Sequence, residues 1–182
     1  MQAEQKEQDK EPRRGFIAGV AALIVGAAAG IVPFLSGATV FLDPLRRRKA
    51  DAGLVLVTKL AAVPPDGVPR KFTVEADFVD AWNTYRNVPV GAVYLRHTDA
   101  GIVAHNVVCP HAGCFVNLAP DRTRFVCPCH KSSFALDGVI NDPTSPSPRD
   151  MDELEVAVQN GDEIWVRYQN FQSGQATKTV AQ

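Results

Sequence analysis

The spacing of apolar and polar residues divides the chain into three stretches. Residues 1–14 are mostly polar, whereas residues 15–42 contain no charged side chain. About 20 apolar residues are enough to cross a lipid bilayer as a helix, so residues 15–42 predict a transmembrane anchor. A cleaved signal peptide is the alternative interpretation, but this apolar run is longer than the core of a typical signal.

From residue 54 onward the apolar residues come in short, partly alternating runs that end at turn residues. Such runs are typical of half-buried strands. Residues 98–101, between the runs 92–96 and 102–108, predict one hairpin, and Asn160-Gly161 is typical of the two-residue turn of a second. The predicted strands cover residues 54–60, 71–74, 92–96, 102–108, 124–126, 154–158 and 164–168, with a reversal at 137–138. Residues 76–85 predict a helical turn or loop that places Phe78, Trp82 and Tyr85 on one side. This pattern indicates an antiparallel sandwich or open barrel.

The overall charge argues against one class of partner, nucleic acid. With 19 Lys and Arg against 20 Asp and Glu, the formal net charge is −1. A nucleic-acid-binding domain usually carries a strong basic excess, so no nucleic acid partner is expected.

The cysteines are the most informative residues in the composition. All four lie in two short stretches that also hold two of the four histidines, Cys109-Pro110-His111-Ala112-Gly113-Cys114 and Cys127-Pro128-Cys129-His130. Each stretch has one closely spaced Cys–His pair and one further cysteine. Thiolates and imidazoles brought together make a metal site. His97 and His105 lie outside both stretches and are interpreted as strand histidines.

Residue spacing leaves two alternatives open: a redox-inactive zinc site, and a metal-free pair of redox-active cysteines. Tetrahedral zinc suits Cys and His ligands, but these spacings are tighter than is usual for zinc and two cysteines would be unused. A thioredoxin-like pair needs two residues between its cysteines, whereas only Pro128 separates Cys127 from Cys129.

A C-x-H-x-G-C stretch followed by C-x-C-H-x-S resembles the signature of Rieske iron–sulfur proteins, and the match extends through Gly113 and Ser132. In Rieske centres two histidines replace two cysteines on one iron of a [2Fe–2S] cluster. The resemblance therefore implies Cys109 and Cys127 on one iron, with His111 and His130 on the other. It also implies a disulfide between the remaining cysteines, Cys114 and Cys129, and a hydrogen bond from the Ser132 hydroxyl to a bridging sulfide.

The same resemblance implies the fold class and the division of the chain. The expected fold is an N-terminal transmembrane helix plus an all-β antiparallel Rieske sandwich with an inserted cluster-binding subdomain. The expected parts are a cytoplasmic tail over 1–14, an anchor over 15–42, a linker or hinge over 43–53, a Rieske domain over 54–169 with cluster loops 109–114 and 127–134, and a flexible tail over 170–182.

Sequence features near the cluster loops refine the expected chemistry. Residues 145–149, Ser-Pro-Ser-Pro-Arg, resemble the proline-rich loop that covers the cluster in quinol-oxidising Rieske proteins. High-potential members carry a tyrosine where this chain has Phe134, which lacks a hydroxyl, so a lower or middle potential within the Rieske range is expected. Ala112 stands where leucine is frequent, and Lys131 where glycine is usual.

The resemblance implies a membrane-anchored oxidoreductase subunit that is active only within a complex. His111 and His130 would serve an exchange of one electron and one proton with quinol, expected to be menaquinol. The implied partners are a cytochrome b type membrane subunit and a c-type cytochrome. The small Rieske subunit of an arsenite-oxidase-like molybdenum enzyme, a soluble ferredoxin that feeds an oxygenase, and a zinc-binding module are the alternatives.

The expected location is the cytoplasmic membrane, with a single crossing. Charge bias does not decide the orientation, because four Lys and Arg residues lie on each side of the apolar run. Arg13-Arg14 resembles a twin-arginine export signal, and a disulfide needs an oxidising space. Both features favour an inner N-terminus and a head on the periplasmic or outer side.

Overall fold

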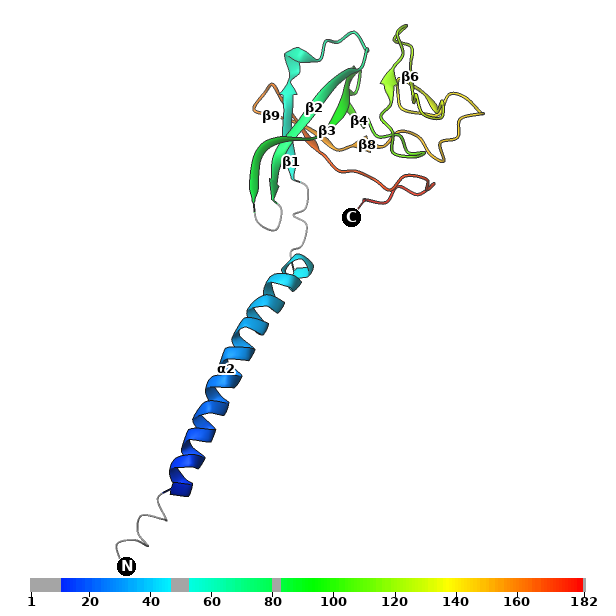
Figure 1. Cartoon of the computed structure of the whole chain (residues 1–182). Coiled ribbons are helices and arrows are strands. Elements are labelled where there is room, and N and C mark those ends of the chain that lie inside the picture. The colour runs from blue at the N-terminus through cyan, green and yellow to red at the C-terminus, as the bar shows by residue number, and fades with distance from the viewer. Residues whose placement is uncertain (1–10, 47–52, 80–82, 182) are drawn as a thin grey trace, which may run out of the picture. The chain divides into compact units, whose positions relative to one another are not determined.

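The computed structural model describes residues 11–46, 53–79 and 83–181 (Figure 1). It divides into two compact units, residues 1–48 and residues 49–182, and each is described by itself.

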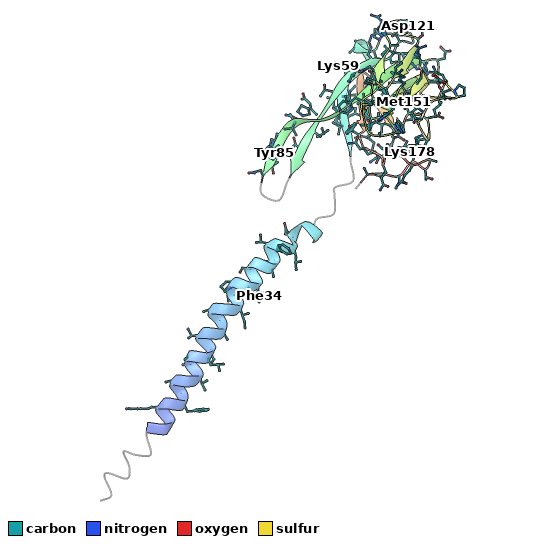
Figure 2. The ribbon with its side chains drawn as sticks, turned by 45° about the vertical axis from the view of Figure 1, so that its right-hand side comes forward. Phe34, Lys59, Tyr85, Asp121, Met151 and Lys178 are labelled. Atoms are coloured by element: carbon teal, nitrogen blue, oxygen red, sulfur yellow. A yellow bond between two sulfur atoms is a disulfide. The ribbon has the colours of Figure 1, made fainter. Side chains whose placement is uncertain are left out.

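The first unit consists of one helix, α2, which spans Glu11–Arg46. Its segment Arg14–Asp43 contains an 18-residue window with a mean hydropathy of 2.3 and is long and apolar enough to cross a membrane. Apolar side chains project outward along it, as the labelled Phe34 does in Figure 2. The Phe34 side chain is 74 % exposed. The expected helix over 15–42 is therefore present.

The boundaries of α2 differ from those expected. The helix includes residues 11–14 of the expected tail and residues 43–46 of the expected linker, and it continues through Pro33. A proline removes only one helical hydrogen bond, and a helix in lipid keeps its remaining backbone groups paired. The rest of the expected tail and linker, residues 1–10 and 47–52, lies outside the described residues.

The base of the second unit contains two antiparallel sheets, with strand orders β1-β10-β9 and β2-β3-β4-β8. The base strands are β1 Leu54–Lys59, β2 Arg70–Val79, β3 Thr84–Thr98, β4 Gly101–Asn106, β8 Glu153–Leu154, β9 Val156–Gln159 and β10 Glu163–Arg167, with a 3₁₀ turn, η1, at Leu60–Ala62. The expected hairpins β3–β4 and β9–β10 both form.

The long hairpin β2–β3 corrects one expectation. Residues 76–79 and 84–85 are strand residues and not a helical turn, with Phe78 opposite Tyr85. Two irregularities in the register let the pairing continue toward the tip of the hairpin. Tyr85 lies near that tip in Figure 2, whereas Trp82 falls outside the described residues.

The core of the base lies between its two sheets. Ile164 and Val166 alternate inward from β10, while Val93 and Leu95 do the same from β3. Burying each such side chain contributes roughly 1.5–3 kcal/mol relative to exposure. The alternation that predicted these strands thus also determines which face of each strand enters the core.

A smaller three-stranded sheet, β5-β6-β7, forms the inserted subdomain. Its strands are β5 Asn117–Leu118, β6 Arg124–Val126 and β7 Ser133–Ala135. Its core is separate from that of the base and consists of Tyr94, Val107, Cys109, Val116, Phe125, Cys127, Phe134 and Met151. Two cysteines therefore form part of a packed apolar core.

The C-terminal segment 170–181, expected to be a tail, makes several contacts in the structure. Phe171 is buried and forms a bridge with Val180, and the Gln172 N–H donates to the Thr179 carbonyl. In Figure 1 this red segment runs from the base toward the lobe that carries β6. One apolar anchor and a few backbone bonds order a stretch whose composition is polar.

Candidate metal centre

The two cysteine-containing loops share one backbone design. In the first loop, the Cys109 N–H donates to the Cys114 carbonyl at 2.7 Å and the Gly113 N–H to the Cys109 carbonyl at 3.0 Å. In the second loop, residues 127, 131 and 132 repeat both bonds, at 2.8 and 3.0 Å. Each loop is therefore a tight turn that begins at a buried cysteine.

Cys109 and Cys127 are both free thiols and both buried. Desolvation by burial raises the pKa of the Cys109 thiol, and the neighbouring Cys127 thiol raises it further. A backbone hydrogen bond at His111 opposes these effects. A buried thiol whose charged form is disfavoured by burial and by a neighbouring thiol is suited to a bound cation, which removes its proton and compensates the charge.

The side chains of His111 and His130, one from each of the two loops, lie next to each other. Their ring centroids are 4.9 Å apart and the rings are nearly perpendicular. The His111 Nδ1 atom is buried and has no hydrogen-bond partner among the described residues. A buried imidazole nitrogen without a partner is unfavourable in a protein alone, whereas a metal ion would satisfy it.

The structure joins Cys114 and Cys129 by a disulfide, with their Cα atoms 6.6 Å apart. This confirms the bridge that the Rieske resemblance implies. The Cys127 sulfur lies within 4.8 Å of both bridged sulfurs, so the disulfide sits directly beside a candidate ligand. The bridge ties the end of the first loop to the middle of the second.

The Ser132 hydroxyl is a second buried group without a hydrogen-bond partner among the described residues. It lies beside the Cys109 sulfur and lowers the pKa of that thiol, but it forms no hydrogen bond of standard geometry. Two buried thiols, two adjacent imidazoles and an unpaired hydroxyl on neighbouring loops fit a two-iron cluster with sulfide bridges.

The proline-rich loop 145–149 is held by its arginine. Arg149 forms a bidentate ion pair with Asp152, at 2.9 Å from Nε and 2.8 Å from Nη2, and both side chains are nearly buried. The Ser147 hydroxyl donates to the Arg149 carbonyl at 2.7 Å. A paired, desolvated arginine of this kind fixes its backbone in one position.

Sequence patterns did not indicate how the subdomain is attached to the base. The Tyr94 hydroxyl, from β3, donates to the Val116 carbonyl and accepts from the Leu118 N–H. Its ring lies 4.7 Å from that of Phe125. Burial raises the pKa of Tyr94, so the hydroxyl keeps its proton for these contacts. The one sequence signal for the burial of Tyr94 was its position in a predicted strand.

Comparison with known proteins defines the class to which this fold and site belong. The family model of the Rieske [2Fe-2S] domain matches residues 56–160. The chain belongs to the Rieske family, and its cofactor is one [2Fe–2S] cluster and not zinc.

The similar proteins narrow the class to electron-transfer subunits of cytochrome bc type complexes. The chain is 30 % identical over 138 residues to the menaquinol:cytochrome c reductase iron-sulfur subunit of Geobacillus thermodenitrificans, covering 74 % of this chain and 78 % of that protein. It is 26 % identical over 156 residues to the cytochrome b6-f complex iron-sulfur subunit of Chlorobaculum thiosulfatiphilum, covering 84 % and 73 %. The solved plasma membrane Rieske protein of Synechocystis has a TM-score of 0.40 and 26 % identity, covering 63 % of this chain and 97 % of that one.

Proposed function

We propose that Cys109 and Cys127 bind one iron of the cluster, and that His111 and His130 bind the other. Support comes from the burial of both thiols, from the 4.9 Å distance between the imidazole rings, and from the unpaired His111 Nδ1. When bound, the cluster supplies a one-electron carrier whose potential is raised by neutral imidazole ligands in place of thiolates.

The protein serves as the membrane-anchored Rieske subunit of a quinol–cytochrome c reductase type complex. It takes one electron from menaquinol in a pocket supplied by a cytochrome b type membrane subunit, and passes it to a c-type cytochrome. The observation that carries this proposal is the similarity, at 30 % and 29 % identity over 138 residues, to two subunits named for menaquinol:cytochrome c reductase.

Exposure of the two histidines suggests how proton and electron leave the substrate together. His130 is exposed at the tip of the second loop, whereas His111 is half-buried. With the cluster bound, a ligand imidazole at the surface would accept a hydrogen bond from the quinol hydroxyl and would hold the proton that the quinol releases, while the cluster would supply the electron acceptor. The two cysteine ligands are buried and shielded from water.

The orientation follows from the same proposal. The N-terminus with Arg13-Arg14 lies in the cytoplasm, and the Rieske head lies on the periplasmic or outer side. The Cys114–Cys129 disulfide supports this orientation because such bridges persist in oxidising compartments.

Purification from native membranes tests the partners. The expected result is that a b-type cytochrome accompanies the protein through solubilisation and that menaquinol reduces the cluster in the purified complex. Co-purification with a molybdenum enzyme, without a b-type cytochrome, would overturn the proposal in favour of the arsenite-oxidase-like alternative.

Redox titration tests the match to menaquinol. Phe134 is fully buried in the core that contains Cys109 and Cys127, and it has no hydroxyl to donate to a cysteine sulfur. A midpoint in the lower or middle part of the family range of about −150 to +300 mV is expected. Phe134→Tyr should raise the midpoint, and Phe125→Tyr in the same core is the control. A wild-type midpoint near the upper limit would contradict the assignment to menaquinol.

A further inference from the structure

The segment 170–181, called the C-terminal strap from here on, makes contacts that follow a pattern. Its first residues belong to the base: Phe171 is buried there, and Asn170 Oδ1 accepts from the buried Asn106 side chain at 3.0 Å. Its last residues return to the same place, since the Ala181 N–H donates to the Asn170 carbonyl at 2.8 Å. The strap is therefore a closed loop whose two ends are anchored on the base.

The tip of the strap contacts the first cluster loop. The Gly174 N–H donates to the Pro110 carbonyl at 2.8 Å. A Cβ atom added to Gly174 would meet the His111 carbonyl at 3.6 Å, and one added to Gly113 would meet the Ser173 hydroxyl at 3.4 Å. The strap thus lies against the backbone on both sides of His111.

The next residue of the strap contacts the proline-rich loop. Arg149 Nη1 donates to the Gln175 carbonyl, while the rest of the same guanidinium is paired with Asp152. Adjacent strap residues, Gly174 and Gln175, therefore connect the first cluster loop to the loop 145–149. Gly174 has a φ of +76°, in the left-handed region that favours glycine, so the turn that makes both contacts depends on this residue.

Among the hydrogen bonds of the described residues, none joins the strap to the second cluster loop. Pro128, Cys129 and His130 are all exposed, whereas Pro110 is buried and His111 is half-buried. The strap also lies beyond residues 56–160, which match the family model.

We propose that the C-terminal strap is a positioning element for the first cluster loop: it fixes the backbone around His111 through Gly174 and couples it to the proline-rich loop through Gln175 and Arg149. The proposal concerns the ligand position of His111 and does not depend on the identity of the electron donor or acceptor. It predicts that disturbing the strap loosens one cluster loop and leaves the other unchanged.

Hydrogen–deuterium exchange of the full-length, cluster-loaded protein tests this, with Gly174→Ala as the variant and Gly161→Ala as its matched control. Gly161 has a φ of +86° in the β9–β10 turn, and nothing lies within 4 Å of an added Cβ, so both substitutions impose similar backbone strain. Gly174→Ala should accelerate amide exchange in residues 109–114 by about fivefold to tenfold, the factor that loss of one hydrogen bond supports, and leave 127–132 unchanged. Gly161→Ala should change neither loop.

A second readout separates positioning from general stability. Gly174→Ala should shift the midpoint potential and its pH dependence, because a displaced imidazole changes the iron that it binds, whereas Gly161→Ala should leave both at wild-type values. A chain ended after Gln172, which keeps the buried Phe171, should show the same effects more strongly.

The proposal would be overturned if amide exchange accelerated equally in both loops, or in neither, and the midpoint potential stayed unchanged. The strap would then have a role in stability alone. Absence of a [2Fe–2S] spectrum in the wild type would instead contradict the proposed ligand set. Failure of the strap and failure of the proposed function are therefore distinguishable.

Discussion

The two cluster loops have similar backbone conformations but are packed differently. Both begin at a buried cysteine, and both place their fifth residue in the left-handed region, Gly113 at φ +78° and Lys131 at φ +62°. The C-terminal strap hydrogen-bonds to Pro110 of the first loop, whereas among the described residues none of its hydrogen bonds reaches the second. One local design can thus present one histidine in a supported position and the other at the surface.

Side-chain chemistry differs at matched positions of the two loops. The sixth position is Cys114 in the first loop and Ser132 in the second, and the disulfide connects Cys114 to Cys129 at the third position of the other loop. The bridge therefore joins unlike positions, and the buried hydroxyl belongs to one loop alone. Matched substitutions in the two loops should accordingly have unequal effects.

The largest effect is expected from removing the bridge that joins the loops. The two cysteines are separated by 15 residues, and closing a loop of that length stabilises a protein by about 3 kcal/mol. Cys114→Ser combined with Cys129→Ser should lose about that free energy of unfolding in urea titrations of the full-length protein. Reduction of the wild type should reproduce the loss, and an unchanged unfolding midpoint would show that the bridge adds nothing.

Removing the hydroxyl that only the second loop carries should lower the midpoint potential. If Ser132 donates to a cluster sulfide, it stabilises the reduced state, and a hydrogen bond to a charged group is worth about 1.5–3 kcal/mol. Ser132→Ala should then lower the midpoint by roughly 60–130 mV for one electron, as measured by redox titration. The neighbouring Ser133→Ala is the control; an equal shift in both variants would argue against a specific bond.

Substitutions at the fifth position of the two cluster loops, Gly113 and Lys131, should change the stability of the protein in opposite directions. A residue with a side chain costs about 1–2 kcal/mol in the left-handed region, and glycine avoids this cost but loses about 0.4–1 kcal/mol through the unfolded chain. Lys131→Gly should therefore stabilise the protein by up to about 1.6 kcal/mol, and Gly113→Ala should destabilise it by up to about the same amount, in thermal unfolding. Lys71→Gly, in strand β2, should be destabilising; a lower unfolding temperature for Lys131→Gly would contradict the strain argument.

The smallest effect concerns a buried histidine of the base that packs against the turn at Gly138. His105 of β4 is buried against Gly138, where an added Cβ would meet its Nε2 atom at 2.5 Å, and desolvation lowers the pKa of His105 below its usual 6.5. The unfolded chain then binds more protons below that value, so stability should fall as the pH drops below 6.5. His105→Gln should flatten this slope in unfolding measured from pH 7 down to about 5, while His97→Gln should preserve it. A slope that survives in His105→Gln would contradict the assignment.

Sequence patterns were sufficient for features that depend on neighbours along the chain. The uncharged run predicted α2, because crossing a bilayer needs only length and apolar character. Alternation predicted the hairpins β3–β4 and β9–β10, since a strand that buries one face must repeat every two residues. The two cysteine stretches indicated the metal centre because its ligands lie close together within each loop.

Tertiary structure decided what depends on contacts between distant residues. One disulfide among four cysteines can form in six ways, and residue spacing does not choose between them. The resemblance implied Cys114 with Cys129, and that bridge forms because the fold brings the two loops together. The polar residues 170–181 carry no periodic pattern, yet they pack because Phe171 is buried and because Gly174 and Gln175 meet the cluster loop and Arg149. Local sequence specifies local conformation and ligand chemistry, whereas the free energy of such long-range contacts exists only once the chain has folded.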